Sequence, residues 1–225
     1  MSYRKLLFFI ILLKSFTVET FGQAIEVTYF GFSNFQKGND SPPFFYGFGY
    51  EQNLGSRIAV SLNWHNGFTF DDQGGGSSDF ESLLPGVNFS YYSRFSWKEF
   101  SYTSKFFFSD NESQSWYVSS GIAYRMTSAT ITTYSIFATP GNESIANQLS
   151  AGGKKDNILI PISISFGGRG SLDDWFGDYF IGFSYIPGAD KKSSGNPTLD
   201  TAIGKGYYRN FCINFGLRVG FGWAD

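Results

Sequence analysis

The sequence predicts an all-β fold of antiparallel strands, and two observations support that prediction. Large apolar residues alternate with small or polar ones along most of the 225-residue chain, and the side chains of a strand point to its two faces in turn. The longest alternating run lies at residues 211–223, where every odd position is a large apolar residue and every even position is small or polar, Arg218 being the one large residue among them. Aromatic residues make up 20% of the chain and charged residues only 16%, against roughly 25% charged residues in ordinary globular proteins.

The N-terminal segment has the layout of a secretory signal peptide. Arg4 and Lys5 precede an apolar run from Leu6 to Leu13, which is too short to cross a bilayer as a helix. Small residues favour cleavage after Gly22. We therefore expect residues 1–22 to be a signal peptide and residues 23–225 to form a single exported domain without a transmembrane helix.

The first half of that domain predicts three strands followed by one ambiguous region. The strands lie at residues 25–32, 44–51 and 57–65, separated by a loop at 36–43 and a turn at 53–56, and a glycine-rich loop covers 67–86. Between residues 87 and 108 the large apolar side chains move from odd to even positions, so that the phase changes at Lys98-Glu99. A β-bulge there gives one long strand and eight strands in all, whereas a tight turn, with a break near 127–129, gives ten.

The second half predicts the remaining strands and shows how the connections alternate. Strands are expected at residues 116–126, 158–166, 178–185 and 206–223. The connections at 109–113 and 168–175 are short, whereas those at 139–156 and 188–205 are long, and residues 144–149 can form one or two helical turns. Short turns alternating with long loops are typical of an up-and-down barrel whose strands cross a membrane.

Three features place the apolar face on the outside, against lipid. The opposite face consists mostly of Gly, Ser, Asn and Ala instead of the Lys and Glu that a water-facing surface carries. Its few charges balance, as buried charges must. Trp and Tyr recur near the ends of the apolar rows, and the distance from Trp116 to Tyr124 corresponds to about 20 Å of membrane normal, close to the ~25 Å apolar band of such barrels. The predicted lumen charges are Glu26, Glu51, Arg57, Glu99, Lys105, Arg125, Asp178 and Arg218.

We therefore predict a transmembrane antiparallel up-and-down β-barrel in the outer membrane of a Gram-negative cell. A soluble secreted β-barrel or sandwich is the alternative. The chain resembles the small bacterial outer-membrane barrels of the OmpA/OmpX/OmpW-like type, especially those of Bacteroidota-like bacteria, over residues 24–225. The resemblance rests on the signal segment, the hairpin-like segments 102–108 and 116–121, and the aromatic end of the last strand. It implies that the last strand is recognised by the barrel-insertion machinery, although here Trp223 is followed by Ala224-Asp225.

The sequence predicts no catalytic, cofactor-binding or metal-binding residues. One cysteine, Cys212, and one histidine, His65, exclude an intramolecular disulfide, a cysteine-built zinc site and a histidine metal cluster. Gly74–Gly76 lacks the lysine and the helix of a phosphate loop, and neither Asp72 nor Asp190 belongs to a calcium loop. The net charge of −2 gives no basic surface for nucleic acid.

The leading hypothesis is a non-enzymatic barrel with a structural or interaction role through its wall and its exposed loops. A barrel of eight strands has an interior that side chains can fill, which favours a plugged lumen over a pore. The expected partners are outer-membrane lipid and the insertion machinery. A barrel that transports small solutes or hydrophobic molecules is the alternative. An outer-membrane hydrolase using His65 as general base is a distant one, because no nucleophile motif accompanies that histidine.

Overall fold

The computed structural model describes residues 23–33, 44–68, 86–108, 114–172, 174–193, 195–202 and 208–223. The expected signal peptide, the loop at 36–43 and most of the loop at 67–86 lie outside the described residues. The described part of the chain contains nine strands. They are β1 (Gln23–Ser33), β2 (Phe44–Asn53), β3 (Ile58–Phe68), β4 (Val87–Phe107), β5 (Gln114–Ala138), β6 (Gly153–Leu159), β7 (Ile162–Leu172), β8 (Trp175–Tyr185) and β9 (Phe211–Trp223).

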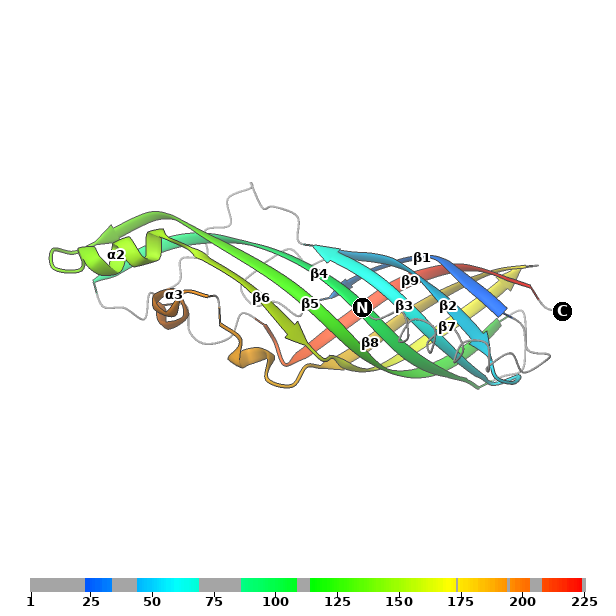
Figure 1. Cartoon of the computed structure of the whole chain (residues 1–225). Helices are drawn as coiled ribbons and strands as arrows, with labels where there is room; N and C mark the ends of the chain where they lie inside the picture. Colours follow the sequence, from blue (N-terminus) through cyan, green and yellow to red (C-terminus); the bar gives the residue numbers. More distant parts are fainter. Residues whose placement is uncertain are drawn as a thin grey trace, which may run out of the picture.

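Eight of these strands pair in a ring (Figure 1). Every pairing is antiparallel, and the sequence of pairs β1–β2, β2–β3, β3–β4, β4–β5, β5–β7, β7–β8, β8–β9 and β9–β1 returns to its starting strand. Each strand therefore neighbours the next one along the chain, apart from β6. The predicted antiparallel up-and-down barrel is confirmed.

Strands β6 and β7 continue one another. Ile162 pairs with Ile122 and Leu159 pairs with Arg125, so both strands keep one register against β5. The interruption falls at Pro161, which has no N–H to donate to the ladder, while its carbonyl oxygen accepts a hydrogen bond from the backbone N–H of Ala123 at 2.9 Å. The predicted strand at 158–166 thus spans both elements, and counting them as one strand gives the expected total of eight.

Strand β4 corrects the expectation of a bulge or turn at Lys98-Glu99. Its register against β3 runs from Ser96 to Phe106 without a shift, and the one irregularity against β5 lies at Phe89/Ser90. The ten-strand alternative is therefore wrong, as is the bulge at 98–99. Odd-numbered side chains point inward along the strand, and what changes at 98–99 is the kind of residue on each face.

The change of polarity marks the place where the sheet leaves the apolar belt of the barrel. After residue 99, inward residues such as Lys105 are polar and outward residues such as Phe100 are apolar. Before residue 98, in the part of β4 that leads to the lobe, inward Phe95 and Trp97 are buried while outward Ser96 is exposed. A strand segment in lipid needs its apolar face outside, whereas one in water needs it inside. The sequence signal was real, but it reports the surroundings of the strand and not its backbone.

Strands β4, β5 and β6 extend beyond the ring as a separate lobe (Figure 1). Helices α2 (Glu143–Ser150) and α3 (Pro197–Ala202) and the 3-10 helix η1 (Ala189–Lys191) belong to this end of the molecule. Leu149 of α2, Ala189 of η1 and Leu199 of α3 are each fully buried in one core with β4 and β5. The amide of Asn196 donates to the carbonyl oxygens of Gln148 and Gly152, at 2.9 and 2.7 Å, and so ties the α3 segment to the end of α2. The expected helical turns at 144–149 correspond to α2.

The outer wall of the ring is apolar. Phe48, Phe100, Phe183 and Leu217 are each 55–59% exposed, and they belong to a belt that includes residues of every strand from β2 to β9. A surface of this extent is stable against lipid and not against water. Together with the buried lumen charges it identifies a transmembrane barrel. None of the helices in the described part of the chain is long and apolar enough to cross a membrane.

The two rims of the ring differ in their connections. At one rim the chain passes from β2 to β3, from β4 to β5 and from β7 to β8 through short connections, whereas the connections from β1 to β2, from β3 to β4 and from β8 to β9 at the other rim are longer. Outer-membrane barrels place short turns on the periplasmic side and long loops on the cell surface. The lobe and the long-loop rim therefore lie on the outer side.

Candidate functional site

Four charged side chains form a closed group in the lumen, which we call the lower cluster: Glu51, Lys105, Arg169 and Asp178. Lys105 Nζ donates to Glu51 Oε2, and it also donates to Asp178 Oδ2 at 2.9 Å. Arg169 Nε and Nη2 donate to the two oxygens of Asp178 at 2.6 and 2.9 Å, and Arg169 Nη1 lies 2.7 Å from Glu51 Oε1. Each cation thus contacts both anions, and the group is neutral.

The lower cluster crosses the lumen. Its members stand on β2, β4, β7 and β8, and in the ring three strands separate β2 from β7 in either direction. The Arg169–Glu51 pair therefore joins opposite walls, while Arg169 and Asp178 are direct cross-strand neighbours. Buried charges are costly unless they are paired, and here each charge is paired with charges from other strands.

Aromatic rings pack against the lower cluster. The Arg169 guanidinium lies 4.1 Å from the ring centroid of Phe176 and 5.0 Å from that of Phe107, and Lys105 Nζ lies 5.2 Å from that of Tyr117. Such cation–ring contacts stabilise a charge in a place where water is scarce. Tyr117 itself is fully buried. The rings of Phe107, Tyr117 and Phe176 thus pack against the two cations of the lower cluster.

A second group of ionisable residues, the upper cluster, consists of His65, Glu99 and Arg125 on three adjacent strands. His65 and Glu99 pair across β3 and β4, and Glu99 and Arg125 pair across β4 and β5. Glu99 Oε1 lies 3.2 Å from His65 Nδ1, and Glu99 Oε2 accepts from Arg125 Nε at 2.5 Å. The Arg125 guanidinium lies 5.6 Å from the ring of Trp97. Unlike the lower cluster, this group stays along one wall.

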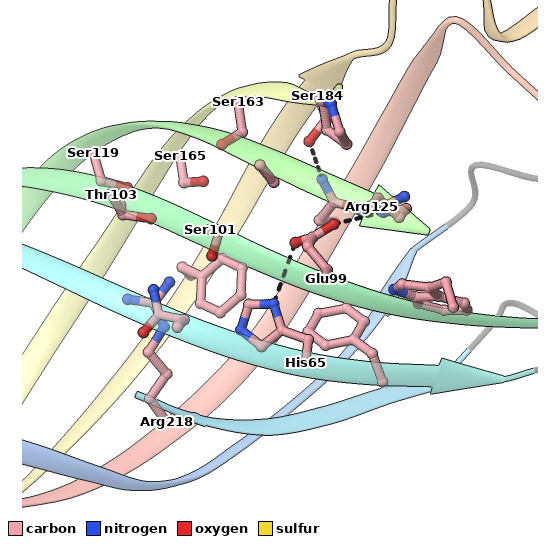
Figure 2. A pocket seen from close by; sticks show the side chains of 17 residues that line it. His65, Glu99, Ser101, Thr103, Ser119, Arg125, Ser163, Ser165, Ser184 and Arg218 are labelled. Carbon is pink, nitrogen blue, oxygen red and sulfur yellow. Dashed lines mark hydrogen bonds and ion pairs between the residues drawn. The ribbon is translucent and has the colours of Figure 1, made fainter. Parts of the chain in front are cut away.

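A small polar cavity of about 60 Å³ adjoins the upper cluster (Figure 2). Its lining brings together hydroxyl side chains of several strands, among them Ser101, Thr103 and Ser119. Figure 2 shows His65 and Glu99 pointing toward one another beside this space. A cavity of this size holds a few water molecules but no organic substrate. His65 therefore has a carboxylate partner beside a space that holds water.

The structure places most of the expected lumen charges inside. Glu51, Glu99, Lys105, Arg125, Asp178 and Arg218 are all buried. Arg218 lies directly across from Asp178 on the neighbouring strand, and its guanidinium is 4.7 Å from the ring of Phe180. The strand that carries Glu26 pairs with β2 and β9 as expected, and the side chain of Glu26 lies outside the described residues.

Arg57 is a correction to the expected set. It precedes the first residue of β3, in the turn after β2, and it is exposed. Its odd position in the sequence matches the odd-numbered inward residues of β3, but a side chain in a turn at the rim reaches water instead of the lumen. It therefore does not belong to the buried charges.

Arg169 is the residue that sequence reasoning missed. We expected a turn at 168–175, whereas β7 continues to Leu172 and only two residues separate it from β8. The alternation of side chains could have found it, because Arg169 stands at an odd position and continues the inward row of Ser163, Ser165 and Gly167. Adding Arg169 and removing Arg57 leaves the number of basic residues in the set unchanged.

The described residues contain no group of three or more His, Cys, Asp or Glu side chains that could hold a metal ion. The lower cluster has only two carboxylates, and both already accept from Lys105 and Arg169. The chemistry that these lumen groups support is therefore mutual neutralisation across the barrel.

Solved structures of other proteins include barrels that are similar to this chain. The chain matches no protein-family model and no curated protein. Among solved structures it is similar to a major outer membrane protein from Thermus thermophilus, at a TM-score of 0.54 and 11% identity, over 89% of this chain and 99% of that one. It also aligns with Ail, the attachment invasion locus protein of Yersinia pestis, at a TM-score of 0.47 and 10% identity, over 92% and 100% of the two chains. Neisserial surface protein A gives a TM-score of 0.48 and 10% identity over 90% and 96%.

The Thermus structure supports the barrel fold, and at 11% identity it supports nothing beyond the fold. With the apolar outer belt and the charged interior, this defines the chain as an integral β-barrel protein of a bacterial outer membrane.

Proposed function

We propose that this protein is a non-enzymatic outer-membrane barrel with a closed lumen, acting in a structural or interaction role through its wall and its outer lobe. The observation that carries the proposal is the lower cluster, whose Arg169–Glu51 pair joins opposite walls. Moving an ion past the cluster requires that at least one of these buried pairs be broken, and breaking such a pair costs about 3–5 kcal/mol. A barrel built in this way holds its own shape and presents its outer parts to other molecules.

Single-channel recording in planar lipid bilayers tests the closed lumen. The unaltered protein should show no steady conductance. A variant that replaces all four members of the lower cluster by serine, which leaves the net charge of the lumen unchanged, should conduct ions. Steady, ion-selective conductance of the unaltered protein would contradict the proposal and support the transport alternative.

Two controls keep that experiment interpretable. Heat-modifiable migration on a gel shows that the variant has folded into a barrel before it is recorded. Replacing exposed Lys154 and Lys191 by serine changes charge outside the lumen and should leave the bilayer silent. Ion conductance of this control variant would show that the conductance comes from general destabilisation of the barrel and not from loss of the lower cluster.

We also propose that the strand β9 carries the signal read by the barrel-insertion machinery and that residues 1–22 are removed on export. The last strand ends at Trp223, which is consistent with the family resemblance. Sequencing the N-terminus of protein from the outer-membrane fraction should give Gln23. Trp223→Ala should lower the yield of folded barrel without lowering synthesis, and an unchanged yield would contradict a role for that residue in insertion.

A further inference from the structure

The outer wall carries a hollow of about 710 Å³ where β3 ends beside β4, β5 and β6. Its lining comes mainly from two rows of outward side chains that run across these strands. The lower row is Tyr46, Asn66, Lys98, Met126 and Ile158, and the upper row is Phe44, Phe68, Ser96, Ser128 and Asp156. All of these residues except Phe44 line the hollow.

Short side chains border the hollow in both rows. Ser96 and Ser128 follow Phe68 in the upper row, and Asn66 lies between Tyr46 and Lys98 in the lower row. A volume of this size falls in the range of sites that bind small molecules. It is more than ten times the volume of the lumen cavity, and it lies on the opposite side of the wall.

The hollow lies at the boundary between lipid and water. The row of outward residues beneath it is Phe48, Trp64, Phe100 and Tyr124, of which Phe48, Phe100 and Tyr124 are 43–57% exposed. The row above it on β4, β5 and β6 is Arg94, Thr130 and Lys154, and all three are exposed. Outward side chains therefore pass from aromatic to polar across the height of the hollow, at the level where lipid headgroups lie.

The charge at this level favours an anion. Lys98 lies in the hollow itself, Arg94 and Lys154 stand above it, and Asp156 is the one carboxylate among these outward residues. Three cations against one anion leave a local charge of about +2 near neutral pH. Ser96 and Ser128 add hydroxyl donors and Asn66 adds an amide, and donors of these kinds bind phosphate oxygens well when a cation is beside them.

We infer that this hollow is a binding site for an outer-leaflet lipid whose phosphate group carries a net negative charge, with the phosphate beside Lys98 and an acyl chain along the aromatic row below. The apolar half of the site continues into the lipid-facing belt, which is why a lipid fits it better than a free anion. The inference rests on the outer-membrane placement in the proposed function and adds a specific lipid contact to it. It does not depend on whether the lumen is closed.

Native mass spectrometry of the folded barrel in detergent tests the inference with four probes. These are dioleoylphosphatidic acid, dioleoylglycerol, dioleoylphosphatidylcholine and inorganic phosphate. Phosphatidic acid should bind with one preferred site per barrel, the other two lipids should bind more weakly, and inorganic phosphate should not compete at equal concentration. Equal binding of dioleoylglycerol would overturn the role of the phosphate, and effective competition by inorganic phosphate would overturn the choice of a lipid.

Two pairs of variants locate the site. Lys98→Glu should weaken phosphatidic acid binding about tenfold or more, the factor expected when a charge-assisted hydrogen bond is lost, whereas Lys191→Glu makes the same charge change elsewhere and should alter it less than about twofold. Ser128→Trp should fill the hollow and weaken binding, whereas Ser120→Trp, at an exposed position on the same strand, should not.

Equal effects within either pair of variants would refute the site. Each variant is first checked for the heat-modifiable migration of a folded barrel, so that loss of folding is not taken for loss of binding. Tryptophan is common where barrel walls meet the membrane surface, so both tryptophan variants should insert. Failure of lipid binding with a silent bilayer recording would reject this site and leave the closed lumen standing.

Discussion

Arg169→Ala should destabilise the barrel more than removal of a charge on its surface. The substitution removes three contacts of 2.6–2.9 Å to the carboxylates of Asp178 and Glu51. Lys105 then remains the one cation of the lower cluster against its two buried carboxylates, and Asp178 and Glu51 lose the donors of Arg169. Loss of one partner from a buried pair costs about 3–5 kcal/mol, and the Arg169 side chain retains 11% exposure, which places the expected loss near the lower end, at about 3 kcal/mol.

The measurement is urea-driven unfolding of the barrel in lipid vesicles, followed by tryptophan fluorescence. Arg94→Ala is the matched control, because Arg94 is exposed on the outer side of β4, where a single charge contributes about 0–1 kcal/mol. The double variant Glu51→Gln, Arg169→Met leaves Lys105 paired with Asp178 and should lose less stability than the sum of the losses of Glu51→Gln and Arg169→Met measured singly. A loss for Arg169→Ala no greater than for Arg94→Ala would refute the closed ion-pair group.

Three further outcomes follow from the same arrangement. Arg218→Ala should lower the unfolding midpoint clearly, because Arg218 is buried, whereas exposed Arg209→Ala on the outer rim should change it little; equal effects would mean that the inward face is assigned wrongly. Phe215→Arg should cost roughly 2–4 kcal/mol if it lies at mid-membrane, and recovery of the protein without detergent in the soluble fraction would reject the membrane assignment. Burial raises the pKa of Tyr91 in the lobe to about 12 from the ordinary 10.0. The folded state then keeps a proton that the unfolded state loses, so stability should fall from about pH 10 upward; Tyr91→Phe should remove that component, as followed by alkaline unfolding, and an unchanged profile would contradict the burial of this phenol.

Much of the barrel was predictable because two-residue alternation is a local property. The apolar and polar rows of residues 44–51 and 211–221 appear in the structure with the phase that the sequence indicates. The inward placement of Glu51, Lys105 and Arg218 follows from the same parity. Arg169 was missed because glycines around it resemble a turn, while the pairing of β7 with β8 extends the strand to Leu172. Arg57 was included because parity alone does not show where a strand begins.

The change at Lys98-Glu99 separates what the order of residues determines from what the tertiary structure determines. The sequence by itself determined that the apolar row changes sides there, since that is a matter of residue order. Whether the backbone turns, bulges or runs straight on depends on the partners of the strand, and the unshifted pairing with β3 and β5 decided it. Likewise, the sequence indicated balanced charges for the interior, but which cation meets which anion depends on strands far apart in the chain. Only ring closure brings Glu51 of β2 within reach of Arg169 of β7, because a contact across a lumen is fixed by the circumference of the barrel and not by any neighbouring residue.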